Sequence, residues 1–247
     1  MKVQYIGHSG FLVTMESCCL LFDYYTGTIP KLPGDRPLYV FSSHRHQDHF
    51  DPEIFSFSEM ADRAEYLLSY DIKLNGHFFR KYPQAANLRD QGRLHSLRSD
   101  EKYVIDNLKI DTIKSTDEGV AFLVSVPREH KRIYHAGDLN WWIWPEDTKQ
   151  EYHNMTAMFQ RSVGRLTELV QDGGMVDVAF LPLDPRQEQY EFCGMEYYLE
   201  HVPVKHVFPM HCWEQYDIIP RFLEAHGGQY PETAIHTITE RGECYEI

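Results

Sequence analysis

The sequence has few of the features that mark secreted or membrane-bound proteins. Its five cysteines are an odd number without regular spacing, which fits reduced thiols in the cytoplasm better than a disulfide framework. The first residues lack the apolar core and small-residue cleavage site of a signal peptide, and no apolar run approaches the length of a membrane span. We therefore expect a cytoplasmic protein with no membrane partner.

Positive charge is also scarce. The chain has 24 Lys and Arg against 37 Asp and Glu, a formal net charge of -13, and it contains no Lys/Arg run. Such a chain repels the phosphate backbone of a nucleic acid. We therefore expect a small-molecule substrate and no nucleic-acid partner, while the oligomeric state stays open.

No internal repeat, low-complexity segment or linker interrupts the 247 residues, so we expect a single domain over residues 1–247. Short apolar runs that are typical of strands fill the first half. A helix is expected over residues 150–171, ended by Gly173 and Gly174. Strands alternate with helices after it, up to a last strand over residues 234–240. This order favours an α/β (α+β) protein with two sheets covered by helices.

Histidine, by contrast, is concentrated in one short segment, HRHQDH, which follows the apolar run 37–43. Its four potential metal ligands are His44, His46, Asp48 and His49. Imidazole and carboxylate groups bind first-row metals, and His-x-His in an extended segment points two imidazoles the same way. An apolar run of this length is typical of a buried strand, so the segment predicts part of a metal site at a strand end.

Two later segments supply further candidates at the ends of predicted strands. YHAGDLN presents Asp138 after Gly137, and FPMHCW presents His211. Taken alone, each has an ordinary alternative, because Asp138 could cap a helix and His211 could be a core histidine. Residues at the ends of separate strands can converge on one sheet edge, however, and a carboxylate between two cations can bridge them.

Together these motifs resemble the metallo-β-lactamase superfamily. HRHQDH fits its His-x-His-x-Asp-His signature, and HAGD and PMH are similar to its later ligand motifs. YIGHSGFLV and IYHAGD resemble in particular the branch of the ascorbate-6-phosphate lactonase-like hydrolases. The resemblance runs over residues 3–213. It implies a four-layer αββα sandwich with metals at one edge between two sheets, and hydrolysis by a metal-activated water.

The resemblance also implies roles for the candidate residues. The implied ligands are His44 and His46 for a first metal, Asp48, His49 and His211 for a second, and Asp138 as a bridge. Asp48 and Asp138 would be the catalytic carboxylates, and Asp48 would orient the nucleophile. His8 resembles a histidine of the family near the site, and we place it with the substrate. Zinc is the expected ion, with manganese or iron as alternatives.

One ligand of the family pattern is missing. The family supplies a further histidine to the first metal, but the corresponding stretch, residues 111–122, contains none. Ser115 falls near that position and Asp117 follows it. Asp117 could substitute as an oxygen ligand, which would favour manganese or iron over zinc. Alternatively the first site is weak, a single metal suffices, or residues 117–119 are only a turn. One or two divalent ions are therefore expected.

Candidates for substrate binding follow the ligand motifs. Trp141, the first of three tryptophans after Asp138, could line the substrate pocket or could pack in the core. Asp184 and Arg186 follow another predicted strand. Arg186 could bind a carboxylate or phosphate in a bidentate fork, or it could pair with Asp184.

The function that these residues favour is that of a metal-dependent hydrolase of a small ester, lactone or phosphoester. The alternative is a metal-binding ligand sensor or pseudoenzyme with an incomplete first metal site. Asp48 favours the enzyme, because this carboxylate serves water activation as much as metal binding.

Overall fold

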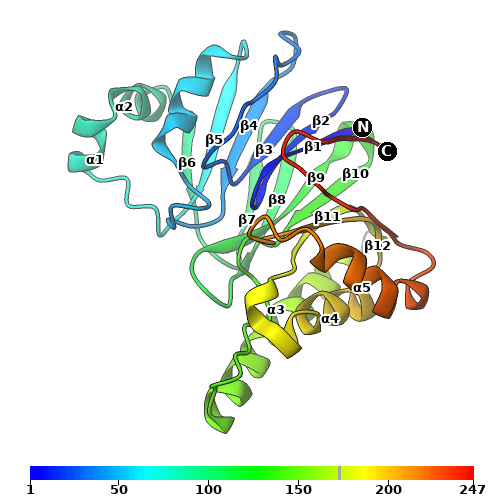
Figure 1. The fold of residues 1–247 in the computed structure, drawn as a ribbon. Coiled ribbons are helices and arrows are strands. Elements are labelled where there is room, and N and C mark those ends of the chain that lie inside the picture. The colour runs from blue at the N-terminus through cyan, green and yellow to red at the C-terminus, as the bar shows by residue number, and fades with distance from the viewer. Residues whose placement is uncertain (172–173) are drawn as a thin grey trace. The chain divides into compact units, whose positions relative to one another are not determined.

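The computed structural model describes residues 1–171 and 174–247 (Figure 1). It divides the chain into two compact units, one of Met1–Arg98 with Arg241–Ile247 and one of Ser99–Glu240. Each unit is built on one seven-stranded sheet with its own helices. The expected α/β class, with two sheets flanked by helices, is therefore confirmed, whereas the single domain over residues 1–247 stays a prediction.

The sheet of the first unit has the order β14-β1-β2-β3-β4-β5-β6. Its strands are β1 (Lys2–Gly7), β2 (Gly10–Thr14), β3 (Cys19–Phe22), β4 (Leu38–Ser42), β5 (Ala64–Ser69), β6 (Leu94–Leu97) and β14 (Cys244–Glu246). The strands from β14 to β3 pair antiparallel, and those from β3 to β6 pair parallel. The carboxyl ends of β3 and β4 therefore lie side by side, at the edge where the histidine-rich segment begins.

The helices of the first unit are the 3-10 helix Pro52–Glu59, α1 (Gly76–Lys81) and α2 (Pro83–Asp90). The 3-10 helix begins where the histidine-rich segment ends, and the Asp51 side chain caps it by accepting from the Glu53 N–H at 2.7 Å. Ala85 and Leu88 of α2 belong to the same buried cluster as Val40 of β4. The loop after β4 is thus held between a buried strand and a capped helix.

The sheet of the second unit has the order β13-β12-β11-β10-β9-β8-β7. Its strands are β7 (Lys102–Ile105), β8 (Leu108–Lys114), β9 (Val120–Val126), β10 (Lys131–His135), β11 (Val176–Pro182), β12 (Val204–Met210) and β13 (Ala234–Ile235). The strands from β7 to β10 pair antiparallel, and those from β10 to β13 pair parallel. Parallel pairing brings the carboxyl ends of β10, β11 and β12 to one edge.

The helices of the second unit are α3 (Lys149–Gln171), α4 (Cys193–His201), α5 (Ile218–His226) and three short 3-10 helices, Pro127–Glu129, Pro185–Tyr190 and Gly227–Gln229. The helix expected over residues 150–171 is confirmed as α3, but Gly173, one of its two expected terminators, lies outside the described residues. Across residues 1–171 and 174–247, no helix combines the length and the apolar character needed to cross a membrane.

The strand expected over residues 234–240 is mostly absent, because β13 contains only Ala234 and Ile235. The His236 N–H still donates to the Val207 carbonyl at 2.9 Å, and the His236 ring then stacks on Phe208 with centroids 4.2 Å apart. Backbone pairing with β12 ends at this ring. The alternating pattern of the segment is therefore a poor guide to its length as a strand.

Candidate metal centre

In the loop after β4, the ring of His44 contacts the rings of both His46 and His49. His44 and His49 are fully buried, and their rings lie 4.2 Å apart between centroids. His44 Nε2 lies 3.0 Å from His46 Nδ1, so the His-x-His pair brings two ring nitrogens to one point. On the other side of the His44 ring, Nδ1 lies 3.0 Å from the hydroxyl of Ser43. The orientation of both His-x-His imidazoles is thus fixed by the loop itself.

The carboxylate of Asp23, a residue that follows β3, binds His49 on the Nδ1 side of its ring. His49 Nδ1 lies 2.7 Å from Asp23 Oδ2, and both side chains are fully buried. Asp23 also accepts the Ser43 N–H at 2.7 Å and the Ser43 hydroxyl at 2.6 Å. Because β3 and β4 are parallel neighbours, Asp23 and Ser43 meet where the two strands end. With Nδ1 bound to Asp23, Nε2 of His49 faces Asp48, whose Oδ2 lies 3.9 Å away.

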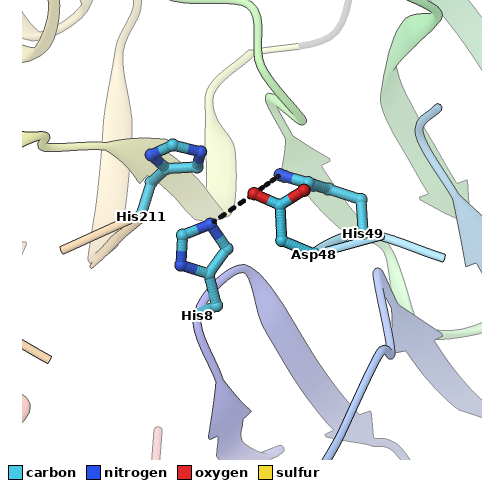
Figure 2. Close-up of side chains that lie close together, drawn as sticks. All are labelled: His8, Asp48, His49 and His211. Atoms are coloured by element: carbon cyan, nitrogen blue, oxygen red, sulfur yellow. Dashed lines mark ion pairs between the residues drawn. The ribbon is translucent and has the colours of Figure 1, made fainter. Parts of the chain in front are cut away.

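His8 and His49 approach the carboxylate of Asp48 (Figure 2). His8 Nε2 lies 3.4 Å and His49 Nε2 lies 3.9 Å from Asp48 Oδ2. Each of the three residues offers a ligand atom within 4.8 Å of the others. Burial raises the pKa of Asp48, but the hydrogen bond from His8 and the charge of His49 outweigh it and hold the pKa well below its ordinary value. Asp48 is therefore ionised, as a metal ligand must be.

The second unit contains a similar arrangement around His211, which follows β12 and is also drawn in Figure 2. His211 Nδ1 lies 2.9 Å from Oδ2 of the buried Asp184, and its Nε2 lies 3.4 Å from Asp138 Oδ1. Asp138, Asp184 and His211 follow β10, β11 and β12 respectively. The parallel pairing of these strands brings the three residues together, as expected for strand ends at one edge.

Asp184 is shared between His211 and Arg186. The Arg186 guanidinium donates to both carboxylate oxygens of Asp184 at 2.6–3.0 Å. The backbone N–H of Arg186 also donates to Oδ1 at 2.9 Å. Burial raises the pKa of Asp184, but hydrogen bonds from His211 and Arg186 outweigh it and lower the pKa to about 2. The ion pair considered as the alternative for Arg186 is thus present. The Arg186 side chain is nevertheless 47% exposed, and its guanidinium lies 4.4 Å from the ring centroid of Trp213.

Asp117 lies on the turn between β8 and β9, where the family histidine is missing. The hydroxyl of the buried Ser115 accepts the Asp117 N–H at 3.2 Å, so the serine shapes the turn. Asp117 and Asp138 each offer a carboxylate oxygen within 4.8 Å of the other. The second unit therefore brings Asp117 next to Asp138, while its role as a ligand stays a prediction.

The tryptophans after Asp138 face different neighbours. Trp141, the predicted substrate contact, stacks on Phe159 of α3 with centroids 5.6 Å apart and donates its indole N–H to Thr156. Trp142 lies with its ring centroid 5.4 Å from that of His211 and donates its indole N–H to the Asp138 carbonyl at 2.9 Å. Of the tryptophans after Asp138, Trp142 therefore contacts both Asp138 and His211, and a substrate role for Trp141 stays a prediction.

Sequence reasoning missed Asp23. The only signal for it is its position in CCLLFDYY, as a carboxylate at the end of a fully apolar run. It also did not predict the backbone conformation of three site residues. His8, Asp23 and His211 have positive φ values of 55°, 42° and 64°. Non-glycine residues rarely adopt this left-handed region, and they gather in it at functional sites. Gly137, with φ 52°, fills the same region before Asp138 at no such cost.

The donor sets of both units fit a divalent transition metal. Each set combines imidazole nitrogens with carboxylate oxygens, the ligands that zinc, manganese and iron accept. His49 and His211 each turn Nδ1 to a buried carboxylate, which is the usual arrangement behind a metal-ligating histidine. The site residues are therefore chemically suited to hold metal.

Solved structures with very different activities resemble this chain. Igni18, a novel metallo hydrolase from the hyperthermophilic archaeon Ignicoccus hospitalis KIN4/I, is 16% identical with a TM-score of 0.61, over 100% of this chain and 98% of that one. CmlA, a diiron beta-hydroxylase from Streptomyces venezuelae, is 12% identical with a TM-score of 0.62, and this chain spans 54% of its length. Human tRNase Z, short form, is 14% identical with a TM-score of 0.58, over 100% and 99% of the two chains. At these identities the likeness shows the fold alone.

No curated protein matches the chain. A family model described as the Beta-lactamase superfamily domain matches residues 2–211, which include every ligand candidate named above. The chain therefore belongs to the beta-lactamase superfamily.

Proposed function

We propose that this protein is a metal-dependent hydrolase that uses a metal-activated water on a small ester, lactone or phosphoester. The observation that carries the proposal is the repeated arrangement at His49 and His211. Each histidine has Nδ1 on a buried carboxylate and Nε2 within 4 Å of a second carboxylate. Family membership supports the proposal as well, because the family model spans the ligand candidates of both units.

The proposed ligand sets follow the pattern of the family. His44, His46 and Asp117 would hold one ion, Asp48, His49 and His211 would hold the other, and Asp138 would serve both. When bound, such ions lower the pKa of water toward 7 and polarise a carbonyl or phosphoryl oxygen. The ions are zinc in the first instance, with manganese or iron where Asp117 supplies oxygen in place of imidazole.

The protein residues around the ions have separate tasks. Asp48 is ionised and held by His8, so its carboxylate can accept a hydrogen from the attacking water and orient it. His8, whose backbone N–H donates to the Tyr5 hydroxyl at 2.8 Å, keeps the Asp48 carboxylate in place and lies where it can touch substrate. The Trp142 ring packs beside that of the buried His211 and so helps to keep water from that side.

The substrate class is the finer part of the proposal. The motifs YIGHSGFLV and IYHAGD favour the ascorbate-6-phosphate lactonase-like branch, and the net charge of -13 favours a small molecule over a nucleic acid. The cytoplasmic location stays a prediction from the cysteine content. Clean ligand binding without turnover would instead favour the metal-binding sensor.

The test measures metal content and turnover in the same preparations. Metal per chain is determined by elemental analysis for wild type, Asp117→Ala and Glu118→Ala, the last being a matched control on the same turn. We expect two ions in wild type and in the control, and one in Asp117→Ala. One ion in all three proteins would point to a mononuclear site without Asp117.

Turnover is then measured with p-nitrophenyl esters and phosphates and added Zn²⁺, Mn²⁺ or Fe²⁺. We expect hydrolysis that chelation abolishes, that metal restores, and that Asp48→Ala lowers by at least about a hundredfold. Persistence of activity after complete chelation would refute a metal-dependent mechanism.

A further inference from the structure

A cavity of about 440 Å³ lies between α3 and the end of β8, entirely within the second unit. Its polar and charged lining consists of Asp100, Lys114, Ser115, Arg161, Ser162 and Arg165. Three cationic side chains therefore face one carboxylate. In a chain with a net charge of -13, such a cluster of positive charge is unexpected.

The cavity is built by the packing of α3 against the sheet. Phe159 and Leu166 are buried on α3, and the Ser162 hydroxyl donates to the carbonyl of Lys114 at 2.8 Å, which fastens the helix to the end of β8. Arg161 and Arg165 are separated by four residues, so both guanidinium groups lie on one face of the helix. The cations thus project from a helix and a strand end that a hydrogen bond joins.

The cations of the cavity are only partly neutralised. Arg165 pairs with Glu168 on α3 at 3.1 Å. Asp100 accepts the backbone N–H of Lys114 at 3.3 Å. Within residues 1–171 and 174–247, no carboxylate lies within 4.0 Å of the Lys114 ammonium or the Arg161 guanidinium. These two groups are exposed and available to a ligand.

The cavity adjoins the turn that carries Asp117. Ser115 lines the cavity, and its hydroxyl accepts the Asp117 N–H at 3.2 Å. Asp117 in turn offers an oxygen within 4.8 Å of one of Asp138. A molecule with one end at Asp138 can therefore extend past this turn toward Lys114 and Arg161.

We propose that this cavity binds an anionic group of the substrate, a carboxylate or a phosphate, while the bond to be hydrolysed lies at the metal centre. The inference rests on the proposed function and narrows its substrate class to small anionic esters, lactones or phosphoesters. A guanidinium offers parallel N–H donors that match a carboxylate or phosphate, and an ammonium adds a point charge. Arg161 and Lys114 are the residues that select for the anion.

Selectivity is tested with two esters that share the scissile bond, p-nitrophenyl butyrate and p-nitrophenyl hemisuccinate, which differ in a terminal carboxylate. The readout is the ratio of kcat/KM for the hemisuccinate to that for the butyrate. We expect wild type to favour the hemisuccinate, and Arg161→Gln and Lys114→Gln each to lower the ratio roughly tenfold, as loss of a charged hydrogen bond does. Arg128→Gln, an exposed arginine of the same unit outside the cavity, leaves the ratio unchanged. Equal ratios in all four proteins overturn the inference.

A binding measurement separates this inference from the proposed function. Inorganic phosphate is titrated calorimetrically into the metal-loaded wild type, Arg161→Gln and Arg128→Gln. We expect wild type and Arg128→Gln to bind one phosphate more per chain than Arg161→Gln, whether or not either ester is hydrolysed. Identical phosphate binding in the three proteins refutes the anion site, while absence of hydrolysis with this difference in binding refutes only the hydrolase.

Discussion

The two histidines that each lie on a buried carboxylate, His49 in the first unit and His211 in the second, resemble each other closely. In both, Nδ1 lies within 3 Å of the carboxylate behind it, 2.7 Å from Asp23 and 2.9 Å from Asp184. In both, Nε2 lies within 4 Å of a second carboxylate, 3.9 Å from Asp48 Oδ2 and 3.4 Å from Asp138 Oδ1, and the proposed function makes this nitrogen the metal ligand. A carboxylate at Nδ1 fixes the ring and makes the free nitrogen a better ligand.

The two pairs differ in what else the carboxylate binds. Asp23 is fully buried, and it also accepts hydrogen bonds from the neutral N–H and O–H of Ser43. Asp184 instead shares its charge with the guanidinium of Arg186, whose side chain is 47% exposed. We infer that the Asp23–His49 pair is part of the packed core. The Asp184–His211 pair, in contrast, responds to changes at the half-exposed Arg186.

Removal of the Asp23 carboxylate should produce the largest effect on folding. Asp23→Ala leaves His49 Nδ1 and both Ser43 donors without their buried acceptor, so we expect a loss of about 3 to 5 kcal/mol in the free energy of unfolding. Denaturant unfolding of the metal-free protein measures it. Asp62→Ala, an exposed aspartate of the same unit, should stay within about 0.5 kcal/mol of wild type. A loss below about 1 kcal/mol for Asp23→Ala would contradict a core role.

The sequence predicts the strands and the ligand motifs better than it predicts the carboxylates that bind the histidines. The α/β class and the buried strand before the histidines follow from apolar runs, and the ligand motifs follow from residue type and spacing. Asp23 does not, because only the parallel pairing of β3 with β4 brings it to Ser43 and His49. Pairing of distant strands is a tertiary property that local pattern does not encode.

The same limit applies in the second unit. Asp184 and Arg186 were expected at the site edge, yet only the pairing of β11 with β12 puts Asp184 behind His211. The elements α1, α2 and β6 are short and only partly buried, so their sequences carry little hydrophobic periodicity. Length and burial therefore decide which elements the sequence predicts.

Asp184→Asn tests the second pair through the metal rather than through folding. An amide keeps the size of the carboxylate but removes the charge behind His211, so we expect metal affinity to fall about 10- to 100-fold. Competition with a chromophoric chelator measures this change. Asp217→Asn, a change at an exposed aspartate whose Oδ2 lies 3.5 Å from Arg221 Nε, should retain wild-type affinity. Unchanged affinity in Asp184→Asn would mean that His211 needs no charged partner.

The pH dependence of stability sharpens the same comparison. The pKa of Asp184 in the folded protein is about 2, below the roughly 3.9 of an unfolded aspartate, so the unfolded chain binds more protons between these values. The contribution of Asp184 is complete above about pH 4 and is lost as the pH falls toward 2. In metal-free protein we expect the stability difference between wild type and Asp184→Asn, on the order of 2 kcal/mol, to shrink across this window. Parallel pH profiles would contradict the low pKa.

The smallest change is expected for Arg186→Gln, because a half-exposed ion pair contributes about 0 to 1 kcal/mol to stability. Asp184 keeps its bond to His211 in this variant, so metal content should stay that of wild type. If Arg186 also touches substrate, KM for the hemisuccinate rises while that for the butyrate does not, and Arg128→Gln changes neither. An unchanged KM for both esters removes Arg186 from substrate binding. It would leave Arg186 with the single task of holding Asp184, and would leave the recognition of anions to the cavity beside α3.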